Sequence, residues 1–418
     1  MEPSTLLTII LAIVAVNFGI EQLLSALNRK HKREDLPKEL EDIYDPDQYR
    51  KSLEYQQAND RFGTVTSSFS FVLSVALLAS GFFGWLDMQL APYFENPVWL
   101  ALAYFGVLFV GSDLLNIPFQ LYHTFVIEEK FGFNKMDLRT FWLDKLKGYL
   151  LSAVLGGLLA GTFVYLVLDI GKDFWVYFWL IAAVIMVLLN MFYTSIFVPL
   201  FNKLTPLGEG ELRSAIEAYS RQVDFPIKNI FVIDGSKRSG KSNAFFSGIG
   251  RQKKVVLYDT LIEKHSVEEL VAVIAHEVGH YKKRHIISGM FLSVLQVGFT
   301  LFLLSLLIFN PQLSLALGAD ALAIHINLIA FGILFSPIST ATGLLMNIWS
   351  RKNEYEADAY AATTYAGNPL GTALRKLSSH NMSNLRPPPW YVFFYYSHPP
   401  LLKRLRAIRQ HGTLRAQA

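Results

Sequence analysis

The residues with the clearest chemical potential are His276, Glu277 and His280, which form the pattern H-E-x-x-H. On an α-helix, residues four positions apart lie on one face, so the two imidazoles can point at one Zn²⁺ ion. Glu277 lies beside them, where it could take a proton from a water that the zinc activates. The pattern therefore predicts a zinc site suited to hydrolysis.

The residues that precede this motif predict the helix that would carry it. Ser266 and Glu269 have the spacing of a capping box, in which each side chain bonds the backbone N–H of the other residue. An apolar run begins directly after them with Leu270 and Val271. The alternative is a helix with two surface histidines and a solvated glutamate, and a third metal ligand would decide between the two.

The third ligand must come from elsewhere, because a catalytic zinc takes three protein ligands and keeps one position open. The chain has no cysteine, so the ligand must be a histidine or a carboxylate. Glu354 and Asp358 share a face of the helix-forming stretch Arg351–Ala362. We expect Glu354 to be the ligand and Asp358 to hydrogen-bond His276, fixing its orientation and basicity. The alternative is a solvated, charged helix end.

The composition of the whole chain is that of a membrane protein. Of its 418 residues, 52% are hydrophobic and 17% are charged, whereas soluble proteins have about 25% charged residues. The net charge of +4 is too small to imply a nucleic-acid partner. Seven apolar segments are long enough to cross a bilayer, which takes about 20 residues. They are Leu6–Leu27, Val65–Trp85, Val98–Phe119, Gly148–Leu168, Trp175–Phe197, Ile287–Phe309 and Leu322–Trp349.

Lysine and arginine are distributed unevenly between the predicted spans. Loops rich in them alternate with loops that have none or one, and the chain after Trp349 is basic. The positive-inside rule then places the N-terminus outside and the C-terminus in the cytosol. This topology divides the chain into spans one to five with their loops (1–198), a cytosolic insert that contains the H-E-x-x-H helix (199–286), spans six and seven (287–349) and a cytosolic C-terminal part (350–418).

The spans also predict where the third ligand lies. The H-E-x-x-H helix runs almost directly into the sixth span, and the seventh span leads almost directly to Glu354. A short outer loop joins these two spans, so they should be antiparallel neighbours. Their cytosolic extensions would then emerge side by side, with Glu354 within reach of His276 and His280 at the membrane surface.

The insert between the fifth and sixth spans predicts a small α+β domain. Gly210–Val223 is helix-like, and Asn229–Asp234, Asn243–Ser247 and Lys254–Tyr258 are strand-like. Gly235–Ser242 also matches the phosphate-binding pattern G-x-x-x-x-G-K-S. A phosphate-binding loop must open a helix. The residues that follow here are β-like and interrupted by glycine, so we expect a polar turn and no nucleotide partner.

Motifs spread over nearly the whole chain resemble the type I CAAX prenyl endopeptidases, integral-membrane zinc metalloproteases that also process the yeast a-factor precursor. The motifs are F-V-I-E-E-K-F-G-F-N-K (125–135), P-L-F-N-K-L-T-P-L (199–207), S-N-A-F-F (242–246), H-E-V-G-H (276–280), E-Y-E-A-D (354–358) and S-H-P-P-L-L-K-R (397–404). The resemblance implies a mainly α fold, in which seven membrane helices enclose a water-filled chamber. A small cytosolic α+β zinc-protease domain of the gluzincin type would cap that chamber.

The resemblance also implies further site residues. His398 and Arg404 are expected to contact the substrate carbonyl, and both can donate hydrogen bonds to an oxyanion. Asn243, Ala244 and Phe245 resemble the edge strand to which an extended substrate adds by β-augmentation.

Together these features predict a membrane endopeptidase with one Zn²⁺ that cleaves near the C-terminus of prenylated CAAX-type or related substrates. A membrane-protein quality-control protease of broad specificity is one alternative. A transporter or channel with a non-catalytic metal site is another, since Asp113 lies within the third predicted span. A bacterial inner membrane is the favoured location, and the endoplasmic reticulum membrane is expected if the chain is eukaryotic.

Overall fold

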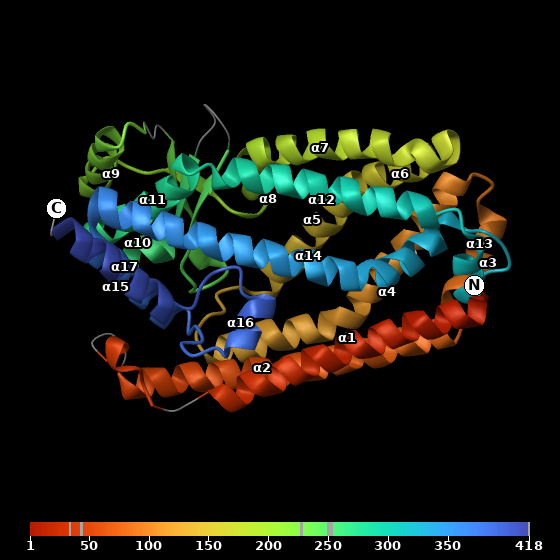
Figure 1. Cartoon of the computed structure of the whole chain (residues 1–418), viewed down its shortest axis with the longest axis horizontal. Coiled ribbons are helices and arrows are strands. Elements are labelled where there is room, and N and C mark those ends of the chain that lie inside the picture. Colours follow the sequence, from red (N-terminus) through yellow and green to blue (C-terminus); the bar gives the residue numbers. More distant parts are fainter. Residues whose placement is uncertain (33–34, 42–44, 226–228, 249–253, 417–418) are drawn as a thin grey trace.

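The computed structural model describes residues 1–32, 35–41, 45–225, 229–248 and 254–416, and long helices dominate it (Figure 1). The first part of the chain forms α1 (Pro3–His31), α2 (Pro46–Ala79), α3 (Phe82–Leu90), α4 (Pro97–Tyr122), α5 (Leu138–Leu151), α6 (Gly157–Ile170), α7 (Phe174–Phe192) and α8 (Val198–Phe201). The middle part forms β1 (Leu204–Pro206), α9 (Glu211–Gln222), β2 (Ile230–Ile233), β3 (Ala244–Ser247), β4 (Lys254–Tyr258), α10 (Asp259–Lys264) and α11 (Val267–Lys282). The remaining helices are α12 (His285–Leu307), α13 (Pro311–Ala316), α14 (Ile324–Ala361), α15 (Gly367–His380), α16 (Pro389–Tyr395) and α17 (Leu401–Ala416).

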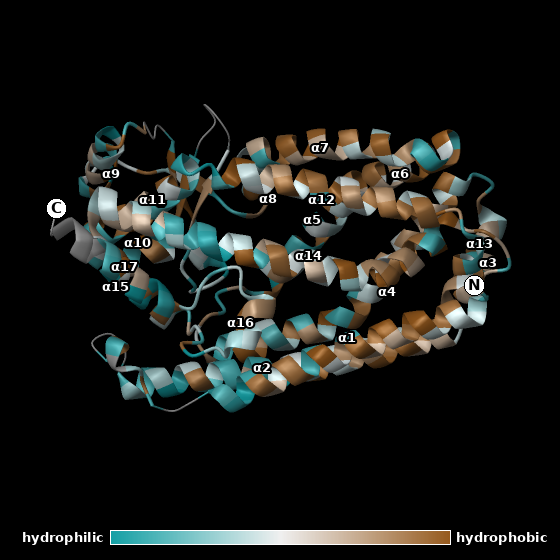
Figure 2. Ribbon diagram, viewed as in Figure 1, coloured by the Kyte–Doolittle hydropathy of each residue, from teal (hydrophilic) through white to brown (hydrophobic). Residues whose placement is uncertain are grey.

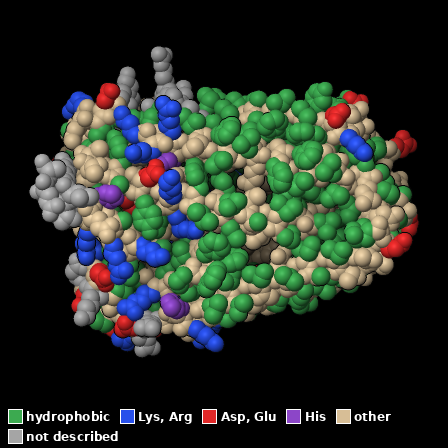
Figure 3. All heavy atoms as spheres, viewed as in Figure 1, with side chains coloured by type: hydrophobic (Ala, Val, Ile, Leu, Met, Phe, Trp, Pro, Cys, Tyr) green, Lys and Arg blue, Asp and Glu red, His purple; other side chains and the backbone are tan. Residues whose placement is uncertain are grey.

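Six helical stretches of the described residues are long and apolar enough to cross a membrane. They are Pro3–His31, Pro46–Ala79, Pro97–Glu128, Leu138–Phe201, His285–Leu307 and Ile324–His380. Figure 2 shows hydrophobic residues along the bundle and hydrophilic residues at the end that carries α9, α11 and α17. On the surface in Figure 3, most Lys and Arg side chains gather at that end, hydrophobic side chains predominate over the middle, and Asp and Glu side chains lie at the opposite end. The molecule is a multi-pass membrane protein, and we call the part formed by α9 to α11 and α15 to α17 its hydrophilic end.

The count of six differs from the predicted seven at one stretch, Leu138–Phe201, which is 64 residues long. At about 1.5 Å per residue, a straight helix of that length would extend roughly 95 Å, about three times the hydrocarbon thickness. The stretch is not straight, because a 3₁₀ turn at Gly171–Asp173 separates α6 from α7 and Gly171 has φ +72°. The two helices pack against each other. The single stretch therefore consists of helical segments on either side of the turn at Gly171–Asp173.

Four strands form one mixed sheet at the hydrophilic end, in the order β1-β2-β4-β3. β2 pairs parallel with β4, while β1 and β3 pair antiparallel with β2 and β4. The structure confirms the three predicted strands and the helix before them, α9, within one residue at each end. Sequence patterns missed β1, whose three residues are too few to show an alternation. In the part of the sheet that the structure describes, β3 is an edge strand.

The hydrophilic end is organised around the contact between α11 and α14. The Ser266 hydroxyl accepts the backbone N–H of Glu269 at 3.3 Å, and the Glu269 carboxylate accepts that of Ser266 at 3.1 Å. These bonds confirm the predicted capping box at the start of α11. Gly279 faces α14 so closely that a Cβ added there would lie 3.1 Å from backbone atoms of Ala357. The two helices can approach because Gly279 has no side chain.

Two cavities adjoin one another among the membrane helices. One of about 850 Å³ is lined by α1, α12, α14 and α16, and the other, of about 760 Å³, by α1, α2, α4 and α14. Asn17 and Glu21 line both cavities, and Gln296 and Asn347 line the first. Polar side chains within membrane helices usually face a bundle interior or a wet cavity. Polar side chains of the membrane helices thus line open hollows next to α14.

The G-x-x-x-x-G-K-S segment does not open a helix. It begins with a single 3₁₀ turn at Gly235–Lys237, and the residues that follow it lead into β3. Lys241 Nζ donates to the Tyr55 hydroxyl at 2.8 Å and pairs with Glu128 at 2.9 Å. The lysine of this motif therefore connects the hydrophilic end to two membrane helices.

Candidate metal centre and active site

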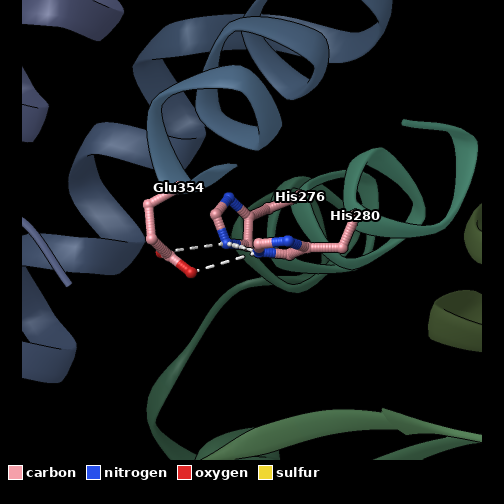
Figure 4. A group of neighbouring side chains, drawn as sticks. All are labelled: His276, His280 and Glu354. Atoms are coloured by element: carbon pink, nitrogen blue, oxygen red, sulfur yellow. Dashed lines mark hydrogen bonds and ion pairs between the residues drawn. The ribbon is translucent and has the colours of Figure 1, made fainter. Parts of the chain in front are cut away.

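His276, His280 and Glu354 converge where α11 meets α14 (Figure 4). The histidines lie on consecutive turns of α11, and Glu354 lies near the end of α14. The Nε2 atoms of the two histidines are 3.2 Å apart. Glu354 Oε1 is 3.2 Å from His280 Nε2, and Glu354 Oε2 is 3.5 Å from His276 Nε2. The structure thus brings together the three residues predicted as metal ligands.

This set of donor atoms fits a zinc ion. Two imidazoles and one carboxylate are a ligand set that catalytic zinc sites use. Tetrahedral ligands about 2.1 Å from a zinc ion lie about 3.4 Å from one another, close to the separations found here. Glu354 Oε2 is also buried without a hydrogen-bond partner, which costs about 1–3 kcal/mol or more. A bound cation would satisfy this oxygen.

Asp358 lies behind His276, one turn along α14 from Glu354. Its Oδ1 is 2.9 Å from His276 Nδ1, the ring nitrogen that faces away from Glu354. Arg404 of α17 donates to both oxygens of Asp358, at 2.6 and 2.8 Å, and its Nη1 lies 3.3 Å from Glu354 Oε2. Burial alone would lower the pKa of Arg404, but the carboxylates outweigh burial and raise it. Arg404, predicted to contact the substrate carbonyl, is only 9% exposed and lies against these two carboxylates.

Glu277 lies between the two histidines on α11. It has no hydrogen-bond partner among the residues that the structure describes. Burial raises the pKa of Glu277, while the charges of His276 and His280 oppose that rise. A carboxyl group that is unpaired and holds its proton more readily than usual is suited to take up and release a proton during a reaction.

His398 lies in the S-H-P-P turn that follows α16. Its Nε2 is 3.3 Å from Glu354 Oε1, and its Nδ1 is 2.9 Å from the Ser397 hydroxyl. The side chain is 62% exposed, so it borders open space beside the ligands. The surrounding protein nevertheless lowers the pKa of His398 through desolvation. The neutral ring that results can still donate one hydrogen bond.

Two further residues of α14 hold the segment that carries His398, and sequence reasoning missed this role for both. Asn347 and Arg351 donate hydrogen bonds of 2.5 to 3.2 Å to backbone carbonyls of α16 and of the residue after it. With Glu354 and Asp358, they lie on one face of α14. Their acceptors are backbone atoms about 40 residues away in sequence, so no side-chain pattern could have pointed to them.

The predicted substrate strand corresponds to β3. Phe245 pairs with Val256 of β4, and the Asn243 carbonyl accepts the backbone N–H of Tyr258 at 3.1 Å. Asn243 is exposed, and Ala244 is half-buried like Phe245. β3 also packs against α11. Its edge away from β4 is not paired with any described strand.

Comparison with known proteins places the chain in a family. Residues 26–203 match the family described as "CAAX prenyl protease N-terminal, five membrane helices", and residues 206–411 match "Peptidase family M48". A CAAX prenyl protease 1 homolog from Arabidopsis thaliana is 35% identical over 388 residues, which cover 89% of this chain and 90% of the relative. The chain belongs to the CAAX prenyl protease family.

More distant members of the family agree. CAAX prenyl protease 1 of Saccharomyces cerevisiae is 33% identical, and the matched residues cover 89% of this chain and 88% of the relative. The crystal structure of S. mikatae Ste24p matches with a TM-score of 0.91 at 31% identity, covering 96% of this chain and 99% of that chain. These findings confirm the predicted family and identify the chain as a membrane metallopeptidase.

Proposed function

We propose that this chain is a zinc-dependent endopeptidase that cleaves peptide bonds near the C-terminus of prenylated CAAX-type proteins. The observation that carries the proposal is the convergence of His276, His280 and Glu354 at spacings that suit one zinc ion. The names of the relatives support the same substrate class for this chain.

The ligand set would hold one Zn²⁺ through the Nε2 atoms of His276 and His280 and the carboxylate of Glu354. When bound, the ion would polarise the scissile carbonyl and acidify the attacking water. Asp358 accepts a hydrogen bond from Nδ1 of His276, which leaves the Nε2 lone pair free for the metal. Arg404 fixes Asp358 with two hydrogen bonds and so positions His276 indirectly.

The proton transfers fall to Glu277, which would take a proton from the attacking water and return it to the leaving amine. The rise in its pKa suits it to both steps, because it must act first as a base and then as an acid. His398 would donate a hydrogen bond to the oxyanion of the tetrahedral intermediate. Arg404 would contribute positive charge there, since its guanidinium already donates two hydrogen bonds to Asp358.

The open edge of β3 would bind substrate as an added strand, with backbone hydrogen bonds from Asn243, Ala244 and Phe245. Because the chain reverses between α6 and α7, we count seven membrane spans. The N-terminus would lie outside and the hydrophilic end in the cytosol. The Lys and Arg side chains gathered at that end in Figure 3 support this orientation. The bacterial inner membrane remains a prediction.

The test is cleavage of a farnesylated CAAX peptide by the purified full-length protein, with metal analysis of the same sample. We expect about one zinc ion per chain, and cleavage that a chelator abolishes and added zinc restores. An unprenylated peptide and an unrelated membrane-protein fragment are the controls. Equal cleavage of all three substrates would favour the quality-control alternative. Bound zinc without cleavage of any of them would refute an endopeptidase.

Asp113, on which the transport alternative depended, has a structural explanation. Its carboxylate accepts hydrogen bonds from Lys145 at 2.7 Å and from the Tyr149 hydroxyl. An ionisable group inside a membrane protein is commonly paired in this way. The interaction ties α4 to α5, and no observation on the described residues favours transport.

A further inference from the structure

The metal-ligand candidate His280 has a side-chain neighbour on the side that faces away from Glu354. Its Nδ1 lies 3.1 Å from Nδ1 of His285, the first residue of α12. The opposite ring nitrogen of His285, Nε2, lies 3.2 Å from Oε2 of Glu356. His285 is 8% exposed, whereas the Glu356 side chain is 39% exposed. A chain of two contacts therefore runs from His280 through a buried ring to a carboxylate at the surface.

A break in the backbone makes the first of these contacts possible. On an uninterrupted helix, side chains five positions apart point about 140° away from each other. α11 ends at Lys282, and Arg284 adopts a left-handed conformation with φ +60° before α12 begins. Residues other than glycine rarely adopt this conformation. The turn changes the direction of the chain, and the ring of His285 meets the ring of His280.

The proton positions along this chain follow from the metal geometry. His280 Nε2 faces Glu354 and His276 and would bind the ion with its lone pair, so its proton must be on Nδ1. His280 Nδ1 then donates to Nδ1 of His285, which must accept. The proton of His285 is consequently on Nε2, where it donates to Glu356. Both contacts become satisfied hydrogen bonds in this one arrangement.

We propose that His285 and Glu356 are positioning residues that orient His280 and raise its basicity toward zinc. The proposal rests on the zinc site of the proposed function. It gives each histidine ligand its own carboxylate support, directly from Asp358 for His276 and through His285 for His280. Such outer contacts typically change metal affinity by about 10- to 100-fold.

The experiment measures the zinc dissociation constant of the full-length protein by competition with a chromophoric chelator. We expect His285→Phe, which keeps a ring of similar shape without nitrogens, and Glu356→Ala each to weaken zinc binding by about 10- to 100-fold. The double variant should be no weaker than His285→Phe alone, because Glu356 acts only through His285. Lys352→Gln is the matched control, since it removes the other ion-pair partner of Glu356, at 3.7 Å.

A conservative variant separates positioning from packing. His285→Asn places an amide oxygen near the position of Nδ1, so it should recover part of the affinity that His285→Phe loses. The visible spectrum of the cobalt-substituted protein should change in His285→Phe and in Glu356→Ala but not in Lys352→Gln, because it reports the geometry of the ligands. A purely structural role for His285 would lower the thermal unfolding midpoint without altering this spectrum.

Two results would overturn the proposal. The first is zinc affinity in His285→Phe and Glu356→Ala within about twofold of the parent protein, well below the expected change. The second is losses that add in the double variant, since additive losses indicate independent sites. A parent protein that binds no zinc would instead refute the proposed function, so the two failures are distinguishable.

Discussion

The substitution Gly279→Ala tests whether the close approach of α11 to α14 sets the metal geometry. A Cβ at this position would lie 3.1 Å from both Cα and the carbonyl oxygen of Ala357, and 3.2 Å from Cβ of Tyr360. Carbon atoms in contact are normally about 3.5–4.0 Å apart. Because the obstacles include backbone atoms, no side-chain rotation relieves the clash. The two helices must therefore separate by roughly 0.5 Å.

That displacement is larger than a zinc site tolerates, since ligand distances vary by about 0.2 Å. Overpacking of this kind costs about 1–3 kcal/mol, and 1.4 kcal/mol is a factor of ten in a dissociation constant. We therefore expect zinc affinity to fall by about 10- to 100-fold, measured by chelator competition, with a parallel loss of peptide cleavage. Gly343→Ala is the control, because it adds the same methyl group to α14 where no atom lies within 4 Å. Unchanged zinc affinity in Gly279→Ala would show that helix spacing does not control the site.

Four further predictions concern proton transfer, buried charge, acidity and metal. Glu277→Gln should retain zinc but cleave the peptide about 10²- to 10⁴-fold more slowly. Loss of bound zinc in this variant would instead indicate that Glu277 is a ligand. Asp358→Asn should destabilise the fold by about 3–5 kcal/mol in thermal unfolding, because it removes the anionic carboxylate to which buried Arg404 donates two hydrogen bonds; an unchanged midpoint would contradict this. Burial lowers the pKa of His265 below its ordinary 6.5, so the stability that it confers is full above pH 6.5 and is lost as the pH falls below that value. His265→Gln should reduce the acid sensitivity of the midpoint, and an identical pH profile would refute the reasoning. Removing zinc should lower the thermal unfolding midpoint, and zinc at about 100 times its dissociation constant should raise the free energy of unfolding by about 2.7 kcal/mol. A midpoint that does not change with zinc would contradict a zinc site in the folded protein.

The ligand set could be predicted from sequence because each step depended on local spacing or on topology. The capping box and the four-residue periods of α11 and α14 are local patterns, and they place His276 above His280 and Glu354 near Asp358. The meeting of the two helices followed from a short loop between antiparallel spans. Neither inference required knowledge of how side chains pack.

The supports of the ligands could not be predicted, because they depend on packing between distant segments. Arg404 lies 46 residues beyond Asp358, and its contacts with Asp358 and Glu354 depend on how α17 packs against α14. His285 reaches His280 only because Arg284 adopts a left-handed conformation, which no side-chain pattern at that position signals. The seven predicted spans correspond to six helical stretches, because only a short 3₁₀ turn at Gly171–Asp173 separates α6 from α7.

α14 continues without interruption for 38 residues, from the membrane to the metal centre. Pro337 lies within this helix, where its ring removes one backbone hydrogen bond and can allow a bend. Glu354 lies near the other end of α14, and the imidazoles that face it belong to α11. A change in bilayer thickness that tilts the membrane part of α14 should therefore shift the carboxylate relative to the imidazoles. Turnover should therefore respond to the acyl-chain length of the surrounding lipid.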